Sequence, residues 1–337
     1  MRRFLLVLLQ LTLLLALAAG IGAGYKWWQY GNEEVIAPGN TASFEIRRGE
    51  GGRPIAATLR GAGIQVEPWE LSLAWRLRGD SSRIKAGRYE LEGPVTLRGL
   101  MDQLVLGQAP KEYMIALIDG WNIRQVREAL ARAPELVQAT AGLSDEQLMQ
   151  KLGADVAHPE GMFAPDTYAY PPGGSDLDVL ARAFRLQQQR VAEAWAARAE
   201  DLPLRDEREL LILASIVEKE SARDDERPLV AGVFVNRLRR GMPLQSDPTT
   251  IYGIGEAFDG NLRRNHLRTD TPYNTYTRGG LTPTPISMPG KGALAATANP
   301  GQTSALYFVS RGDGTSEFSE TLERHNRAVN RYQRKAR

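Results

Sequence analysis

The chain has 337 residues, of which 42% are hydrophobic and 24% charged, as expected for a globular protein with room for two domains. Its formal net charge of +2 gives no basic footprint for nucleic acid, so we expect no nucleic-acid partner. The absence of cysteine excludes disulfides, thiol nucleophiles and thiolate metal sites together.

The first element is a long apolar segment over residues 4–24, interrupted only by Gln10 and Thr12. A helix of about 20 apolar residues is long enough to cross a bilayer, so we expect residues 1–30 to form a transmembrane anchor. A cleaved signal peptide is the alternative, with "ALA" at 16–18 as its cleavage motif. The apolar run continues past that motif, which favours a retained anchor.

The residues that flank this segment predict its orientation. Arg2 and Arg3 precede it, and Trp27, Trp28 and Tyr30 follow it. Positive charge favours the cytoplasmic side, and aromatic side chains favour a membrane interface. We therefore expect a single-pass protein of the bacterial inner (plasma) membrane with a cytoplasmic N-terminus and an extracytoplasmic remainder.

Residues 31–42 resemble a linker, and a small α+β module is expected over 43–110. Strands are predicted over 42–49 and 81–93, and helices over 53–64 and 96–108. This order of strands and helices resembles the LysM-like module of wall-associated proteins, which implies binding to glycans that contain N-acetylglucosamine. A spacer between the membrane and the next domain is the alternative.

A larger, mostly helical α+β domain is expected over 111–337. Helices are predicted over 119–133, 176–199, 208–222, 225–241 and the final segment, an ordered loop over 160–173, a loop-rich stretch over 242–303, and a strand over 307–310. The fold class expected for the whole chain is α+β.

The helix over 208–222 carries two carboxylates out of an apolar run, Leu210–Val217. Glu218 and Glu220 are separated by roughly 200° around a helix, so they do not form a dyad on one face. Small side chains surround Glu218, which leaves space for a ligand and allows partial burial to raise its pKa. Glu220 is expected to pair with Arg223. The alternative is that both carboxylates lie at an ordinary solvated helix end.

Several motifs resemble one family when they are taken in order from Ile115 to Asn326. They are "ASIVEKES", "VFVNRLRRGMPLQSDPTTIYG", "YNTY", "GGLTPTPISMPG", "ALAATANP" and "LYFV". Together they resemble the YceG-like endolytic peptidoglycan transglycosylases. The resemblance implies that Glu218 is the catalytic residue of a membrane-anchored lytic transglycosylase.

The resemblance implies cleavage between N-acetylmuramic acid and N-acetylglucosamine within nascent glycan strands, which would terminate their elongation. Glu218 would protonate the glycosidic oxygen and then act as a base on the sugar's 6-hydroxyl, giving 1,6-anhydro ends. This chemistry needs one carboxylate, whereas ordinary glycosidases use two. A hydrolase using Glu218 and Asp247 stays open, as does a non-enzymatic glycan-binding scaffold of wall synthesis.

Polar and aromatic side chains from two motifs are candidates for substrate binding. They are Gln245, Ser246, Asp247, Tyr273, Asn274, Thr275 and Tyr276. Aromatic faces and amides suit sugar hydroxyl and acetamido groups. The alternatives are that the Asp-Pro sequence forms a turn and that the tyrosines belong to the core.

The histidines, His158, His266 and His325, show no metal-binding spacing, so no metal and no cofactor are expected. Ser316 stands close to the position where many members of the family carry a histidine, so any role that the resemblance would assign to that histidine is in doubt for this chain. The expected partners are peptidoglycan glycan strands and the membrane, with peptidoglycan synthases implied by the resemblance alone.

Overall fold

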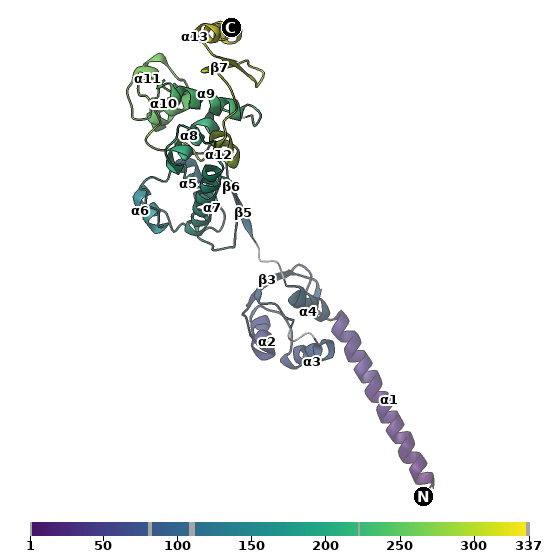
Figure 1. Ribbon diagram of the computed structural model, residues 1–337. Coiled ribbons are helices and arrows are strands. Elements are labelled where there is room, and N and C mark those ends of the chain that lie inside the picture. The colour runs from purple at the N-terminus through teal and green to yellow at the C-terminus, as the bar shows by residue number, and fades with distance from the viewer. Residues whose placement is uncertain (1, 80–82, 108–111, 222, 335–337) are drawn as a thin grey trace. The chain divides into compact units, whose positions relative to one another are not determined.

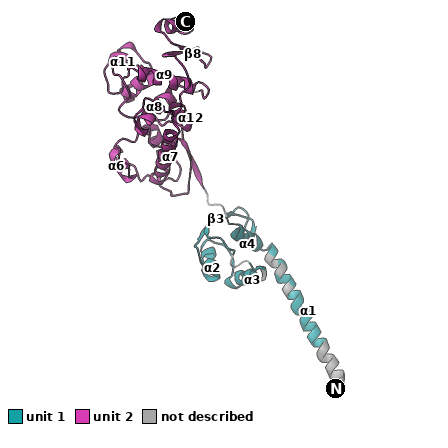
Figure 2. Cartoon of the chain, in the orientation of Figure 1, with its two compact units in different colours: residues 1–111 teal, residues 112–337 magenta. Residues whose placement is uncertain are grey.

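The computed structural model describes residues 2–79, 83–107, 112–221 and 223–334, and the chain is a mixture of helices and short strands (Figure 1). It divides into two compact units, residues 1–111 and 112–337 (Figure 2). The α+β class expected from the sequence is therefore confirmed.

The first unit begins with helix α1, Arg2–Asn32. Among the described residues, no helix combines the length and the apolar character needed to cross a membrane. The side chains of residues 1–9, 23, 27, 29 and 30 lie outside the described part of the chain, and the predicted anchor with its Trp27 and Tyr30 falls partly on them.

The rest of the first unit is built on two small antiparallel sheets. The elements are β1 (Glu34–Ile36), β2 (Thr41–Ile46), α2 (Gly52–Gly61), α3 (Pro68–Arg78), β3 (Gly87–Glu92), β4 (Val95–Thr96) and α4 (Leu97–Leu106), with β1 paired to β4 and β2 to β3. Strand β2 alternates strictly between exposed and buried residues, as its sequence predicts. Phe44 lies opposite Tyr89 and stacks on it at 5.3 Å between ring centroids.

Helices α2 and α4 confirm the predicted helices, whereas α3 lies in a stretch where no element was predicted. Its apolar side chains do not follow one face, because Trp69 and Leu73 are exposed while Leu71 and Trp75 are buried. The resemblance of this unit to a LysM module stays a prediction.

The second unit contains the helix with the two carboxylates. Its elements are β5 (Tyr113–Leu117), α5 (Ile123–Arg132), α6 (Asp145–Lys151), β6 (Asp166–Tyr170), α7 (Asp176–Ala196), α8 (Glu207–Glu220), α9 (Arg227–Arg239), α10 (Asp247–Ile254), the 3-10 turn η1 (Gly255–Ala257), α11 (Arg264–Arg268), α12 (Lys291–Ala298), β7 (Tyr307–Ser310), β8 (Ser316–Ser319), α13 (Leu322–Val329) and the π-helical turn η2 (Asn330–Arg334). Strands β5 and β6 form one antiparallel pair, and β7 and β8 form another.

Helix α8 is the centre of this unit, in contact with α7, α9, α10 and α12. Asp206 caps its N-terminus by accepting a hydrogen bond from the Glu209 backbone N–H at 2.9 Å. Every residue of Leu210–Val217 is buried, as the apolar run predicts. The Ser215 hydroxyl accepts a hydrogen bond from the Ile286 N–H at 3.0 Å, which attaches the Pro-rich segment to this helix.

The structure adds short elements where loops were expected. Strand β6 lies inside the predicted loop over 160–173, and three helices, α10, α11 and α12, lie inside the stretch over 242–303. These helices have five to eight residues, too short for a clear periodic signal. The N-cap of α9 is Glu226, and the preceding Asp225 accepts hydrogen bonds from Arg223.

Candidate active site

Three consecutive residues at the end of α8 line three different cavities. Glu218 lines a cavity of 610 Å³, Lys219 one of 1000 Å³ and Glu220 one of 600 Å³. Successive residues of a helix point in directions about 100° apart, so a buried helix end can serve several cavities at once. We name these the Glu218, Lys219 and Glu220 cavities.

Glu220 has the more strongly perturbed carboxyl group. Its Oε1 atom accepts a hydrogen bond of 2.6 Å from the Ser246 hydroxyl. The Glu220 pKa is raised to about 7, mainly by burial and to a smaller extent by Asp247, while the Ser246 hydrogen bond and Arg237 act against the rise. The predicted pairing with Arg223 is wrong, because Arg223 instead holds Asp225 through bonds of 3.0 and 2.6 Å.

Three of the predicted substrate-binding residues line the Glu220 cavity: Gln245, Asp247 and Tyr276. Gln245 and Asp247 are exposed, and the Tyr276 hydroxyl donates a 2.6 Å hydrogen bond to Asp247 Oδ1. A carboxyl held protonated near neutral pH therefore lies in one cavity with an amide, a carboxylate and an aromatic ring.

Ser246 is buried between these two exposed neighbours, which is how its hydroxyl reaches Glu220. Gln245 adopts a left-handed backbone with φ of 50°, an uncommon conformation for a residue other than glycine. Thr275 stabilises it, because its carbonyl accepts from the Gln245 N–H at 3.1 Å and its hydroxyl from the Ser246 N–H at 3.0 Å. Thr275 therefore sets the course of the chain that carries Ser246.

Asn274 and Thr275 are 0% and 2% exposed, so they do not face the cavity. The Asn274 amide donates to the carbonyls of His266, Leu267 and Thr269, and its oxygen accepts from Thr250. Tyr273 packs edge-on against Tyr252 at 4.8 Å between ring centroids, away from this cavity. These three side chains support the cavity wall, and their contact with sugar stays a prediction.

Arg237, for which the sequence predicted no role, also lines the Glu220 cavity. Its guanidinium is buried and donates to the carbonyls of Leu306, at 2.7 Å, and Leu244, at 2.9 Å, and to Gln245 Oε1 at 3.2 Å. A charged residue inside the apolar run of α9 was the available signal, since such a residue is rarely buried without a partner.

The C-terminal elements complete the Glu220 cavity. His325 lines it and stacks on Tyr307 at 5.2 Å between ring centroids. Burial holds the His325 pKa below 6.5, which favours a neutral ring. Ser316, the first residue of β8, also lines this cavity.

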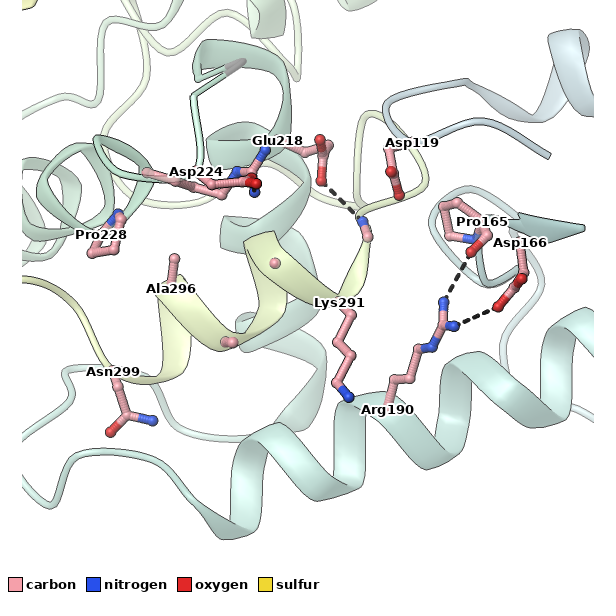
Figure 3. A pocket seen from close by; sticks show the side chains of 14 residues that line it. Asp119, Pro165, Asp166, Arg190, Glu218, Asp224, Pro228, Lys291, Ala296 and Asn299 are labelled. Atoms are coloured by element: carbon pink, nitrogen blue, oxygen red, sulfur yellow. Dashed lines mark hydrogen bonds and ion pairs between the residues drawn. The ribbon is translucent and has the colours of Figure 1, made fainter. Parts of the chain in front are cut away.

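Glu218, the residue predicted to be catalytic, lines a cavity with none of the seven predicted substrate-binding residues (Figure 3). Its Oε2 atom accepts a 2.9 Å hydrogen bond from the Gly290 N–H at the start of α12. Burial raises the Glu218 pKa above 4.5, Arg227 lowers it, and the nearby Asp119 raises it. The assignment of Glu218 as the catalyst stays a prediction, and the structure separates it from the residues expected to act with it.

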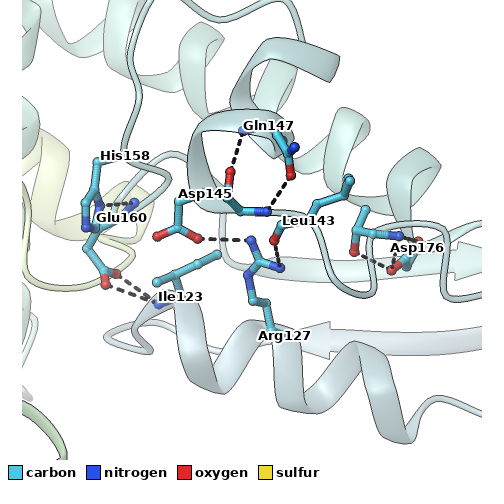
Figure 4. Close-up of polar contacts among 10 residues, drawn as sticks. Ile123, Arg127, Leu143, Asp145, Gln147, His158, Glu160 and Asp176 are labelled. Carbon is cyan, nitrogen blue, oxygen red and sulfur yellow. Dashed lines mark hydrogen bonds and ion pairs between the residues drawn. The ribbon is translucent and has the colours of Figure 1, made fainter.

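The Lys219 cavity contains a third perturbed carboxyl, Glu160, which is 1% exposed. Its oxygens accept from the Ile123 N–H at 3.1 and 3.2 Å, as Figure 4 shows, and from the Tyr252 hydroxyl at 3.0 Å. Burial raises the Glu160 pKa to about 7. Glu160 joins α5 to α10, and no local sequence pattern predicted it.

Comparison with known proteins gives one consistent family. The model of the YceG-like family matches residues 44–331. A Bacillus subtilis protein named endolytic murein transglycosylase is 29% identical, over 87% of this chain and 85% of the relative. A Streptococcus pneumoniae protein of the same name is 26% identical over 95% of this chain, which spans only 63% of that relative.

A solved structure agrees with this result. The crystal structure of a yceG-like protein from Listeria monocytogenes is 26% identical and superposes with a TM-score of 0.56, over 85% of this chain and 98% of the other. The family match covers well over half of the chain, and the similarity in structure extends over both compact units. The chain therefore belongs to the YceG-like family.

Proposed function

We propose that this chain is an endolytic murein transglycosylase, a lytic enzyme that cleaves peptidoglycan glycan strands, and that Glu220 is its acid and base. The observation that carries the proposal is the desolvated Glu220 carboxyl, with a pKa of about 7, in one cavity with Gln245, Asp247 and Tyr276. A general acid works best when its pKa lies close to the working pH. The names of the relatives support the substrate class.

The proposed reaction uses one carboxyl twice. Glu220 donates its proton to the glycosidic oxygen as the bond from that oxygen to C1 of N-acetylmuramic acid breaks. The resulting carboxylate then takes the proton of the same sugar's 6-hydroxyl, whose oxygen bonds to C1. The product is a 1,6-anhydro end, and Glu220 regains its proton, so no water enters the balance.

The neighbours of Glu220 have roles that follow from their contacts. The Ser246 hydroxyl, at 2.6 Å from Glu220 Oε1, leaves Oε2 available for proton transfer. Asp247 places negative charge in the same cavity, which would stabilise positive charge developing at C1. Gln245 and Tyr276 offer an amide and a ring to the sugar.

Glu218 is the second candidate for the acid, because its pKa is also raised by burial. Two features weigh against it. The rise in its pKa is smaller than that of Glu220, and half of the residues that line its cavity are charged rather than suited to a sugar. Comparing Glu218→Gln with Glu220→Gln therefore decides which carboxyl acts.

Hydrolysis is the second candidate function, because Asp247 lies in the Glu220 cavity and could activate a water. A glycan-binding scaffold without activity is the third reading. Mass spectrometry of glycan strands incubated with the full-length protein separates these possibilities. Anhydro ends support the lyase, reducing ends the hydrolase, and intact strands with binding retained the scaffold.

The variants assign the acid in the same experiment. We expect Glu220→Gln to lose anhydro products by about 100-fold or more, as for removal of a general acid, and Glu218→Gln to keep most of the activity. Full activity in Glu220→Gln together with loss in Glu218→Gln would refute the assignment and favour the Glu218 cavity.

We also propose that α1 anchors the protein in a membrane with the second unit on the extracytoplasmic side. The apolar run over 4–24 behind Arg2 and Arg3 supports this orientation. Glycan binding by the LysM-like module and association with peptidoglycan synthases rest on the family resemblance. Protease accessibility of the second unit in intact spheroplasts tests the orientation.

A further inference from the structure

The Glu218 cavity, which the proposed reaction does not use, is lined by charged side chains of both signs. Its volume of 610 Å³ lies within the range of about 300–1,000 Å³ typical of small-ligand sites. Two cations of the cavity are neutralised, since Arg190 bonds Asp166 at 2.6 Å and Arg227 bonds Asp224 at 2.5 Å. The Arg190 pair forms part of the cavity wall, whereas Arg227 keeps its Nε–H group, which its pair with Asp224 does not use.

Two carboxyl groups of the cavity remain, on which the charges of Arg227 and Arg190 act without direct contact. Neither Glu218 nor Asp119 forms an ion pair with any residue that the structure describes, and both line this cavity (Figure 3). Glu218 accepts the Gly290 N–H, and a Cβ atom added to Gly290 would lie 2.1 Å from Asp119 Oδ1. The missing side chain of Gly290 therefore lets both carboxyls converge, where one ammonium group would bond to both.

Positive groups are available in the same cavity. Lys291, the first residue of α12, has no hydrogen-bond or ion-pair partner within residues 112–221 and 223–334. The buried Nε atom of Arg227 has no hydrogen-bond partner among the described residues. The Arg227 guanidinium lies against Gly292, and a Cβ atom added to Gly292 would be 2.5 Å from Arg227 Nη1. Both groups suit a carboxylate.

An end group with an ammonium and a carboxylate on one carbon would satisfy both sets of charges. We propose that the Glu218 cavity binds the zwitterionic end of a diamino acid, as an uncross-linked peptidoglycan stem peptide presents it. The ammonium would lie between Glu218 and Asp119, and the carboxylate beside Lys291 and Arg227. The identity of the ligand rests on the proposed function.

The chemistry makes the site selective. Cross-linking acylates the side-chain amine of the diamino acid, which removes the positive charge and adds bulk. An acylated amine cannot donate three charged hydrogen bonds to the two carboxyls. The cavity would therefore favour strands whose stem peptides have not yet been joined.

Binding of a sugar-free probe tests the site separately from glycan cleavage. The probe is the tripeptide Ala-γ-Glu-diaminopimelate, titrated calorimetrically into the full-length protein in detergent. We expect binding to weaken about tenfold or more when the probe's side-chain amine is acetylated or its side-chain carboxylate amidated. Asp119→Asn and Lys291→Ala should weaken binding of the free probe similarly.

Matched controls use exposed residues of the same types outside the cavity, Lys151→Ala and Asp155→Asn, which should bind as the unchanged protein does. The modified probes keep the test valid if a variant fails to fold, since they use the unchanged protein. Equal binding of the acetylated probe, or no binding of the free probe at millimolar concentration, would overturn the inference. Probe binding without glycan cleavage would instead overturn the proposed function alone.

Discussion

Replacing Ser246 with alanine tests whether the protonation of Glu220 controls the reaction. The Ser246 hydroxyl donates a 2.6 Å hydrogen bond to Glu220 Oε1, which favours the charged form and lowers the Glu220 pKa. Its loss must therefore raise that pKa. Ser246 is the N-cap residue of α10 but makes no side-chain capping bond, so the helix loses no cap.

The size of the effect follows from the energy of the bond. A hydrogen bond to a charged group contributes about 1.5–3 kcal/mol, and about 1.4 kcal/mol corresponds to one pKa unit. The Glu220 pKa of about 7 should rise by roughly one to two units in Ser246→Ala. Since the acid must be protonated to act, the falling limb of the pH–rate profile should move to higher pH by the same amount.

The assay is the initial rate of anhydro-end formation between about pH 5 and pH 10, measured as kcat/KM for the free enzyme. Ser304→Ala is a matched control, because the Ser304 hydroxyl also donates to a carboxylate, that of the exposed Glu320. Its profile should not move. A lower rate at every pH with an unmoved falling limb, or a limb displaced to lower pH, would refute the reasoning.

Two further predictions concern stability. Because burial raises the Glu220 pKa from 4.5 to about 7, ionisation of Glu220 opposes folding increasingly as the pH rises through this window. Glu220→Gln should therefore be more stable than the unchanged protein above about pH 7, by roughly 3 kcal/mol, and no more stable near pH 4. Equal melting temperatures of the two proteins across this range would contradict the prediction. Gly290→Ala should cost about 1–3 kcal/mol through overlap of its Cβ with Asp119, as denaturant unfolding would show. The cost of Gly290→Ala should fall when Asp119 is also replaced by alanine. The control Gly279→Ala, where nothing lies within 4 Å of the added Cβ, should show no such cost. An equal cost of Gly290→Ala with and without Asp119 would exclude this contact as the cause.

The sequence alone determined the elements with strong local signals. The eight apolar residues Leu210–Val217 predict a buried helix, because no solvated face remains on such a segment, and α8 is buried along that run. The alternation in β2 and the one-sided pattern in α4 likewise predicted their elements and their buried faces. The family also followed from the order of the motifs, because each motif is a local string.

The partners of each carboxylate were decided by the tertiary structure. Helical spacing separated Glu218 from Glu220, but it assigned Glu220 to Arg223, since only neighbours along the helix are visible in the sequence. The true partner, Ser246, is 26 residues away and reaches Glu220 because Thr275 holds its chain. Long-range hydrogen bonds of this kind leave no periodic trace, so the sequence could name the candidate residues but not which carboxyl they surround.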